Sequence, residues 1–314
     1  MGRSPIAPPQ GGEKASLRVG VEAHWLMFHL AGLLALFAAA HSLAAEPAPF
    51  LVTRNLTYAD RNGTRLLLDA YVPKADGPLP AVLVVHGGAW VMGDKDQLAA
   101  YAKGLAEQGF AAFAINYRLA PKSKHPAQIE DCREAIRWMR TTGAKHKVDP
   151  DRIGAVGYSA GGHLVSLLAV TGRDAQADPG KVGTRIRAAV AGGAPVDFRE
   201  VPRDAGLFTY WLGDTRAKAP GLYVDASPSA HLTPDDAPVF FYHGTKDWLV
   251  PEAPARAMSQ ALMKHGVASA FHTVKDADHI GAALSAEALL EGIIFFKRHL
   301  RPRPPGGATS PKAP

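Results

Sequence analysis

The sequence is poorest in cysteine, since its 314 residues include one, Cys132. A single cysteine excludes an internal disulfide framework and any zinc or iron–sulfur site built on paired cysteines. Cys132 lies in a segment with helical spacing, and we expect it to be a small buried apolar residue. The sequence also has only a small excess of one charge. Its 35 Lys and Arg and 29 Asp and Glu give a formal net charge of +6.

The small basic excess is concentrated at the two ends of the chain. Residues 1–45 carry three Lys or Arg and two Asp or Glu, and residues 301–314 carry three Lys or Arg and no acid. Residues 46–300 therefore have a net charge of +2. A marked basic excess is typical of nucleic-acid binders, so we expect no nucleic-acid partner. The 47% of hydrophobic residues excludes a disordered or collagen-like chain.

Long apolar runs are absent except near the start of the chain, where residues 25–40 are apolar apart from His29. Charged residues precede this run and small residues follow it, a pattern typical of a secretory signal peptide. We expect residues 1–45 to be this signal, with cleavage after Ala44 or Ala45. The protein is then exported, to the periplasm or the medium, without stable membrane association. The alternative is an uncleaved anchor, but the run is shorter than the roughly 20 residues that span a bilayer.

The rest of the chain reads as one domain with a tail. Residues 301–314 are rich in Pro, Gly and small residues, and we expect a disordered tail because they cannot bury enough apolar surface to fold. Residues 46–300 show no internal repeat and no second linker. We therefore expect a single catalytic domain over residues 46–300, of a length ample for a packed core.

Within this domain, apolar runs of strand length alternate with segments of helical spacing. Strands that are continuously apolar are buried on both faces, and the intervening helices supply the cover. An Asn-Gly pair at 62–63 indicates an opening hairpin. The pattern predicts a three-layer α/β sandwich with a mostly parallel sheet of about eight strands. We expect strands at 55–58, 65–72, 81–85, 111–116, 152–158, 186–191, 238–242 and 269–274, and helices at 96–108, 126–142, 160–170, 251–265 and 282–299.

The connection between the strands expected at 186–191 and 238–242 is the one long irregular stretch. Loops of this size in a compact domain are usually functional, which predicts a small lid around residues 193–237. Phe208, Tyr210 and Trp211 lie in it. They are candidates for an aromatic wall around the acyl group of a substrate, or equally for the hydrophobic core of the lid.

The strongest catalytic signal is a G-x-S-x-G segment at residues 157–161, Gly-Tyr-Ser-Ala-Gly. It falls between an expected strand and an expected helix, the setting in which such a serine is a nucleophile. The helix that begins at Ala160 also directs its N-terminal N–H groups toward a developing oxyanion. We predict Ser159 as the nucleophile, the alternative being an ordinary Gly-rich turn.

A second motif, His-Gly-Gly-Ala-Trp at residues 86–90, directly follows an expected strand. It is an HGGG-type segment with alanine in the last glycine position. The backbone N–H groups of Gly88 and Ala89, with that of Ala160, are predicted to form an oxyanion hole. Trp90 is a candidate substrate contact and equally a candidate core residue. The histidine of this motif is expected to bond within its own loop.

A serine nucleophile needs a base, and the base needs an acid to orient it. Asp247 and His279 each follow the carboxyl end of an expected strand, where open α/β sheets bind ligands. They also occur in the chain order Ser, Asp, His. We predict Asp247 as the acid and His279 as the base, with Asp197 as the alternative acid. No metal ligand set is predicted.

These residues resemble the α/β-hydrolase superfamily, and more narrowly its branch of hormone-sensitive-lipase-like esterases, kynurenine formamidases and bacterial feruloyl and acetyl-sugar esterases. The resemblance covers residues 50–300 and includes Asn-Tyr-Arg-Leu-Ala-Pro at 116–121 and His-Pro-Ala-Gln-Ile-Glu-Asp at 125–131. Two features depart from it: the N-terminal helical cap of the lipase-like members is missing, and Ala89 narrows the pocket where they have glycine.

The resemblance implies an exported serine carboxylesterase that works through an acyl-enzyme and needs no cofactor. The implied substrates are small-molecule or polysaccharide-linked esters with short-chain, acetyl-sugar or hydroxycinnamoyl groups. Two alternatives remain open: an arylformamidase or small amidase or peptidase with the same triad, and a non-catalytic binding protein. The sequence does not indicate an oligomeric state.

Overall fold

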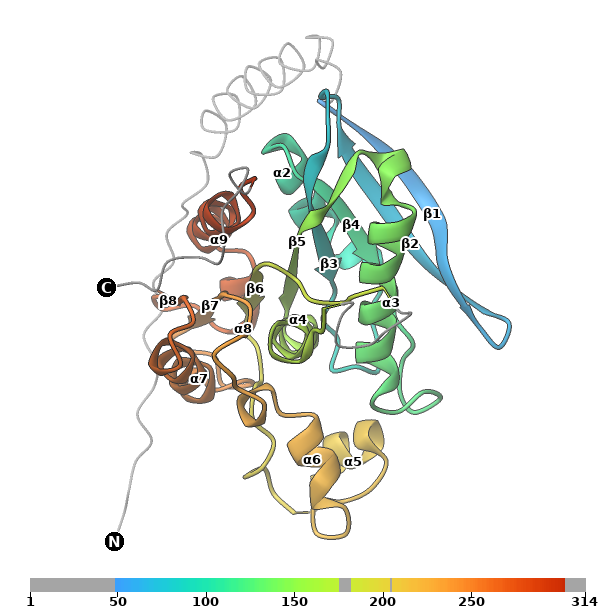
Figure 1. Cartoon of the computed structure of the whole chain (residues 1–314). Coiled ribbons are helices and arrows are strands. Elements are labelled where there is room, and N and C mark those ends of the chain that lie inside the picture. The colour runs from blue at the N-terminus through green and yellow to red at the C-terminus, as the bar shows by residue number, and fades with distance from the viewer. Residues whose placement is uncertain (1–48, 175–181, 204, 303–314) are drawn as a thin grey trace, which may run out of the picture. The chain divides into compact units, whose positions relative to one another are not determined.

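The computed structural model describes residues 49–174, 182–203 and 205–302 (Figure 1). The expected signal peptide at 1–45 and residues 303–314 of the expected tail lie outside the described residues. Within the described ranges, no helix has the length and apolar character needed to cross a membrane.

One sheet of eight strands forms the centre of the described domain, in the order β1-β2-β4-β3-β5-β6-β7-β8. The pairs β1–β2 and β2–β4 are antiparallel, and all later pairs are parallel. This confirms the mostly parallel sheet that the apolar runs predict. The strands are β1 (Phe50–Arg61), β2 (Thr64–Pro73), β3 (Leu79–Val85), β4 (Ala111–Ile115), β5 (Val148–Tyr158), β6 (Ala189–Gly192), β7 (Val239–Gly244) and β8 (Ser269–Val274).

Helices follow the strands and cover both faces of the sheet (Figure 1). They are α2 (Ala99–Glu107), α3 (Ala127–Thr141), α4 (Ala160–Thr171), α5 (Gly206–Leu212), α6 (Pro220–Asp225), α7 (Glu252–Lys264), α8 (His279–Ala283) and α9 (Ala286–His299), with short 3-10 turns at Lys95–Leu98, Gly143–His146 and Pro228–Ala230.

Strand β3 shows why the central strands are apolar throughout. Leu83 and Val85 are buried in a cluster with residues of α3, α4 and α7. Val82 and Val84, which point to the opposite face, are buried with residues of α2 and α9. Successive side chains of a strand point to opposite faces, so a strand between two helical layers has no solvent-facing position. The three-layer sandwich is confirmed.

The opening hairpin turns at Asn62 and Gly63, which both have positive φ, 54° and 80°. The predicted Asn-Gly turn is therefore confirmed. The first strand is longer than the predicted 55–58. Most side chains of β1 are exposed, so the sequence shows no apolar pattern over its full length. A strand at the edge of a sheet does not need an apolar pattern, so its length was not visible in the sequence.

The C-terminal segment differs from the prediction of one helix over 282–299. The structure breaks it into α8 and α9 at Ser285, whose hydroxyl accepts a hydrogen bond from the N–H of Ala288. A serine in this role ends one helix and begins the next. Helix α8 also begins earlier than predicted, at His279.

Candidate active site

Ser159 occupies the turn between β5 and α4, as the sequence predicts. Its φ of 55° and ψ of −121° fall in a region that costs a non-glycine residue roughly 1–3 kcal/mol. The neighbouring glycines are required sterically: a Cβ on Gly157 would lie 2.4 Å from the carbonyl carbon of Gly161, and a Cβ on Gly161 would lie 2.0 Å from the carbonyl oxygen of Val85. The strained turn holds the serine between the end of the strand and the start of the helix.

Asp247 and His279 form a hydrogen-bonded pair. Nδ1 of His279 lies 2.7 Å from Oδ2 of Asp247, and the other carboxylate oxygen accepts hydrogen bonds from the N–H groups of Leu249 and Val250. The Asp247 side chain is fully buried. Since a carboxylate oxygen accepts, Nδ1 of His279 carries the proton and Nε2 is the nitrogen left to act as a base.

Shared neighbours bring His279 to the serine turn. The hydroxyl of Tyr158, the residue before Ser159, donates to the carbonyl of His279, and the two rings lie 5.1 Å apart. Gly193 is also close, because a Cβ on it would lie 3.0 Å from Cε1 of His279. Ser159 itself is anchored next to this residue, since its N–H donates to the carbonyl of Gly192. Within the described residues no hydrogen bond joins Ser159 to His279, and such contacts often tighten only when substrate binds.

The three predicted oxyanion donors are available for a ligand. In the described ranges the N–H groups of Gly88, Ala89 and Ala160 donate to no other part of the chain. Ala160 begins α4, where the first N–H groups have no partner within the helix. Gly88 and Ala89 have positive φ, 101° and 51°. A Cβ on Gly88 would lie 2.1 Å from the carbonyl oxygen of Met92, so this tight loop accepts only glycine there.

His86 supports the loop that carries Gly88 and Ala89, here called the oxyanion loop, and is unsuited to be the base. Its Nδ1 donates to the carbonyl of Gly87 at 2.7 Å, and its ring stacks on that of Tyr117 at 4.2 Å. Burial lowers the pKa of His86 to about 4, although the bond to Gly87 and nearby Asp94 oppose the shift. The residue is neutral near pH 7 and shapes the turn.

Two of the four aromatic candidates for substrate contacts are buried in the core. Trp90 and Trp211 are 2% and 0% exposed, and their rings stack at 3.7 Å and 4°. Of the two roles that the sequence leaves open for them, substrate contact and core, these two residues have the core position, because each indole uses its face to cover the other. Phe208 packs partly buried beside this pair, and Tyr210 is exposed. The lid expected at 193–237 contains α5 and α6 (Figure 1).

His163 is the residue that sequence reasoning underrated. It lies one turn into α4, fully buried, and contacts the indole of Trp90 from one nitrogen and the carbonyl of Ala226 from the other. Its place within the helix expected at 160–170 is visible in the sequence, but the residues that it joins are not. The feature of the sequence that could have singled it out is a histidine within the otherwise mostly apolar α4.

The alternative acid, Asp197, is engaged elsewhere. Its carboxylate binds the guanidinium of Arg199 and the hydroxyl of Ser229. Burial opposes ionisation of Asp197, but these hydrogen bonds outweigh it and lower its pKa. Of the two candidate acids, Asp247 is the one that hydrogen-bonds to a histidine, His279, beside the Ser159 turn.

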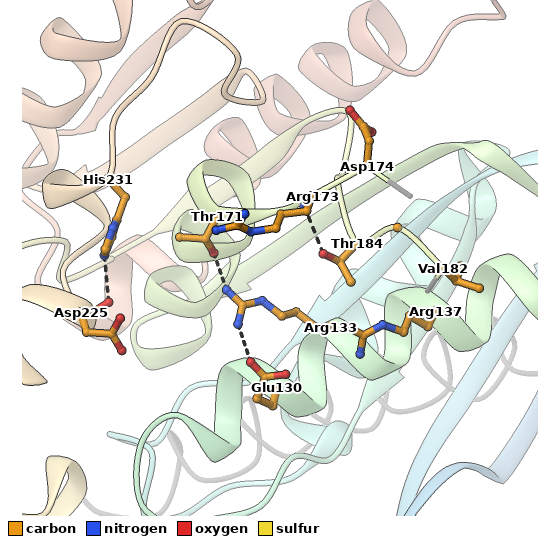
Figure 2. Close-up of a pocket in the computed structure, with 11 residues that line it drawn as sticks. Glu130, Arg133, Arg137, Thr171, Arg173, Asp174, Val182, Thr184, Asp225 and His231 are labelled. Carbon is orange, nitrogen blue, oxygen red and sulfur yellow. Dashed lines mark hydrogen bonds and ion pairs between the residues drawn. The ribbon is translucent and has the colours of Figure 1, made fainter. Parts of the chain in front are cut away.

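A separate polar cavity of about 400 Å³ lies near the far end of α4 (Figure 2). Thr171, at the last position of α4, lines it, whereas Ser159 precedes the first position, so about 18 Å of helix separate the two. Arg133 spans the cavity wall between Glu130 and Thr171. Three arginines and three acidic residues line the cavity, so its lining is polar and nearly neutral. The full lining is Glu130, Arg133, Arg137, Thr171, Arg173, Asp174, Val182, Gly183, Thr184, Asp225 and His231.

One group of side chains in the described residues has the donor set of a cation site. Ligand atoms of His272, Glu287 and Glu291 lie within 4.8 Å of one another, and Nδ1 of His272 is 3.1 Å from a carboxylate oxygen of Glu291. These residues belong to β8 and α9, and none is part of the Ser159–His279–Asp247 group.

Known proteins resemble this chain in sequence over much of its length. The BD-FAE family profile matches residues 68–262. LipM of Mycobacterium tuberculosis, described as a probable carboxylic ester hydrolase, is 37% identical over 59% of this chain and 45% of its own length. Esterase LipQ of the same organism is 31% identical over 70% of this chain and 56% of its own length. This chain thus spans about half the length of these relatives.

A solved structure shares the fold over nearly its whole length. The truncated form of a carbohydrate esterase from gut microbiota superposes with a TM-score of 0.74 at 25% identity, covering 81% of this chain and 98% of that one. The α/β-hydrolase fold expected from the motifs is therefore confirmed.

Proposed function

This chain belongs to the BD-FAE family, and we propose that it hydrolyses carboxylic esters with Ser159 as its nucleophile. The relatives that it matches include esterases. The observation that carries the proposal is the 2.7 Å bond between Asp247 and His279 beside a serine in a strained turn. The N–H groups of Gly88, Ala89 and Ala160 have no acceptor among the described residues, and their loop lies beside the serine, since a Cβ on Gly87 would lie 3.3 Å from that of Ser159. Together they provide a nucleophile, a base with its proton fixed on Nδ1, and donors for an oxyanion.

The reaction proceeds in two halves. In the first, Ser159 attacks the ester carbonyl while Nε2 of His279 takes the serine proton, and Asp247 stabilises the imidazolium that forms. The N–H groups of Gly88, Ala89 and Ala160 bind the negative oxygen of the tetrahedral intermediate. His279 then gives its proton to the departing alcohol, leaving an acyl-enzyme. In the second half, water activated by His279 releases the acid and restores Ser159.

Carbohydrate-linked acetyl and other short-chain acyl esters are the proposed substrates. The carbohydrate esterase that shares the fold supports this class. The burial of Trp90, which directly follows the oxyanion donor Ala89, in a stack with Trp211 supports a small acyl group, because neither ring is free to line a larger pocket. Hydroxycinnamoyl esters, which the sequence equally allows, need a larger acyl pocket.

Replacing Ser159 by alanine tests the proposed function. We expect Ser159→Ala to abolish hydrolysis of p-nitrophenyl acetate and labelling by a fluorophosphonate, with an unchanged circular dichroism spectrum. Full retained activity in the folded variant overturns the assignment. A wild-type protein that is folded but neither labelled nor active on any ester favours a non-catalytic binding protein.

A substrate panel separates the remaining alternatives. We expect the wild type to prefer acetylated xylan and p-nitrophenyl acetate to the octanoyl ester and methyl ferulate. Faster cleavage of formylkynurenine than of every ester would instead identify an arylformamidase.

We also propose that the enzyme acts outside the cytoplasm. The charged start, apolar run and small residues of the segment 1–45 support this. N-terminal sequencing of the protein from fractionated cells is expected to begin at Ala45 or Glu46, and an intact N-terminus in the cytoplasmic fraction contradicts export.

A further inference from the structure

The oxyanion loop is held in an unusual shape by residues far along the chain. Gly88, Ala89 and Trp90 have three consecutive positive φ angles, 101°, 51° and 63°. Alanine and tryptophan avoid this region, and such conformations persist only where the surroundings over-determine them. The question is therefore which contacts hold Ala89 and its N–H in place.

Trp90, the residue after Ala89, is held by contacts from distant parts of the chain. The indole N–H of Trp90 donates to Nδ1 of His163 at 3.1 Å, and Nε2 of His163 donates to the carbonyl of Ala226 at 2.7 Å. Trp211 covers the indole face. The chain of contacts therefore runs from the oxyanion loop through the nucleophile helix to the segment that carries α5 and α6.

The protonation state of His163 is fixed by these partners. A carbonyl oxygen only accepts and an indole N–H only donates, so the ring carries its single proton on Nε2. Burial lowers the pKa of His163 to about 3, which keeps the ring neutral near pH 7 although the bond to Ala226 opposes the shift. The backbone of His163 is also fixed relative to the nucleophile, because its main-chain N–H donates to the carbonyl of Ser159.

We propose that His163 is a positioning residue for the oxyanion hole: it joins Trp90 to Ala226 and so holds the Ala89 N–H where the oxyanion forms. The inference rests on the proposed esterase function. It also changes the role of the segment around α5 and α6, which braces the hole through Trp211 and Ala226 instead of acting only as a cover. Misplacing an oxyanion donor lowers the rate without changing how ground-state substrate binds.

Two substitutions of His163 separate positioning from packing. His163→Leu fills similar volume but makes neither hydrogen bond, whereas His163→Gln offers an oxygen to the indole and an N–H to Ala226. We expect His163→Leu to lower kcat on p-nitrophenyl acetate about 10- to 100-fold, with KM within threefold of wild type. We expect His163→Gln to keep at least a third of kcat.

A trifluoromethyl ketone gives a readout that a purely structural role does not move. Ser159 adds to its carbonyl, and the resulting oxyanion occupies the hole. We expect His163→Leu to weaken this inhibitor by the same factor as kcat. The matched control is Ser166→Ala, on the same helix and also buried, whose hydroxyl bonds to the carbonyl of Gly162 and does not contact Trp90. We expect its inhibitor affinity to equal that of the wild type.

The outcomes are distinct. Wild-type kcat and inhibitor affinity in folded His163→Leu overturn the inference while leaving the esterase assignment intact, and so does a loss of kcat without a loss of inhibitor affinity. An inactive wild type overturns the assignment itself. If His163→Leu does not fold, Trp90→Phe keeps the stacked ring and removes the indole donor, and the same loss of kcat and inhibitor affinity is expected; its absence overturns the inference.

Discussion

The two sides of Ser159 use their large apolar residues in opposite ways. On the oxyanion side, Trp90 and Trp211 are fully buried in one stack. On the histidine side, Trp248 directly follows Asp247 and is 82% exposed, and Ile280 directly follows His279 and is 65% exposed. Buried aromatic residues fix the shape of a loop, whereas exposed ones are free to contact a ligand. From this difference we expect the oxyanion side to be rigid and the histidine side to contact ligands.

The largest expected effect belongs to the pair that orients the base. Asp247→Asn keeps the size of the side chain but presents an N–H to Nδ1 of His279, so the histidine carries its proton on Nε2 and cannot accept one from Ser159. We expect kcat to fall on the order of 10⁴-fold. Steady-state kinetics on p-nitrophenyl acetate measure it.

The matched control for this variant is Asp197→Asn, because Asp197 holds Arg199 and Ser229 rather than a histidine. A near-neutral Asp247→Asn together with an inactive Asp197→Asn would reassign the acid and break the comparison on its histidine side.

The oxyanion side is expected to show its largest effect in stability. Trp90→Ala removes a 2% exposed indole that packs on Trp211, His163 and Phe198. Replacing a buried tryptophan by alanine costs about 3–5 kcal/mol. We expect a loss of this size in the free energy of unfolding, measured by urea denaturation at pH 7. A loss below 1 kcal/mol would mean that the stack does not brace the loop.

Acid is expected to weaken the fold through its buried histidines. Burial lowers the pKa of His86 and His243 to about 4 and that of His163 to about 3. In the unfolded chain a histidine binds its proton near pH 6.5, so the unfolded state binds more protons below that pH and stability falls as pH drops from 6.5 toward 4. Each of these histidines contributes up to about 1.4 kcal/mol per pH unit in this window.

His243 allows this to be tested away from the oxyanion side. Both of its ring nitrogens are buried, and no described residue hydrogen-bonds to them. We expect His243→Phe to reduce the slope of unfolding free energy against pH between 6 and 4.5. An unchanged slope would show that the acid sensitivity arises from other groups.

The sequence predicts one side of the comparison better than the other. Ser159, Asp247 and His279 are visible because each follows an apolar run of strand length, and local glycines reveal the strained turn. The burial of Trp90 is not visible, because it depends on Trp211, 121 positions further along the chain, and on His163 between them. Burial of an aromatic residue in a loop is decided by long-range packing, which a periodic pattern does not record. The start of α8 at His279 has a local cause instead, because the side chain of Asp278 accepts a hydrogen bond from the N–H of Gly281 and caps the helix.

The smallest expected effect on stability comes from Trp248, and it gives the sharpest contrast with Trp90. Because its side chain is 82% exposed, Trp248→Ala should change the free energy of unfolding by no more than about 0.5 kcal/mol. The departing alcohol takes its proton from Nε2 of His279. Trp248 directly follows Asp247, the partner of His279, and we expect its exposed indole to contact a large alcohol group. Loss of an aromatic contact of about 0.5–1.5 kcal/mol then lowers kcat/KM for phenyl acetate relative to methyl acetate by roughly two- to tenfold. Met263→Ala, an exposed apolar residue on α7, is the control and should leave this ratio unchanged. An unchanged ratio in Trp248→Ala would show that the exposed indole does not contact the alcohol, and the two sides of Ser159 would then differ in burial without differing in use.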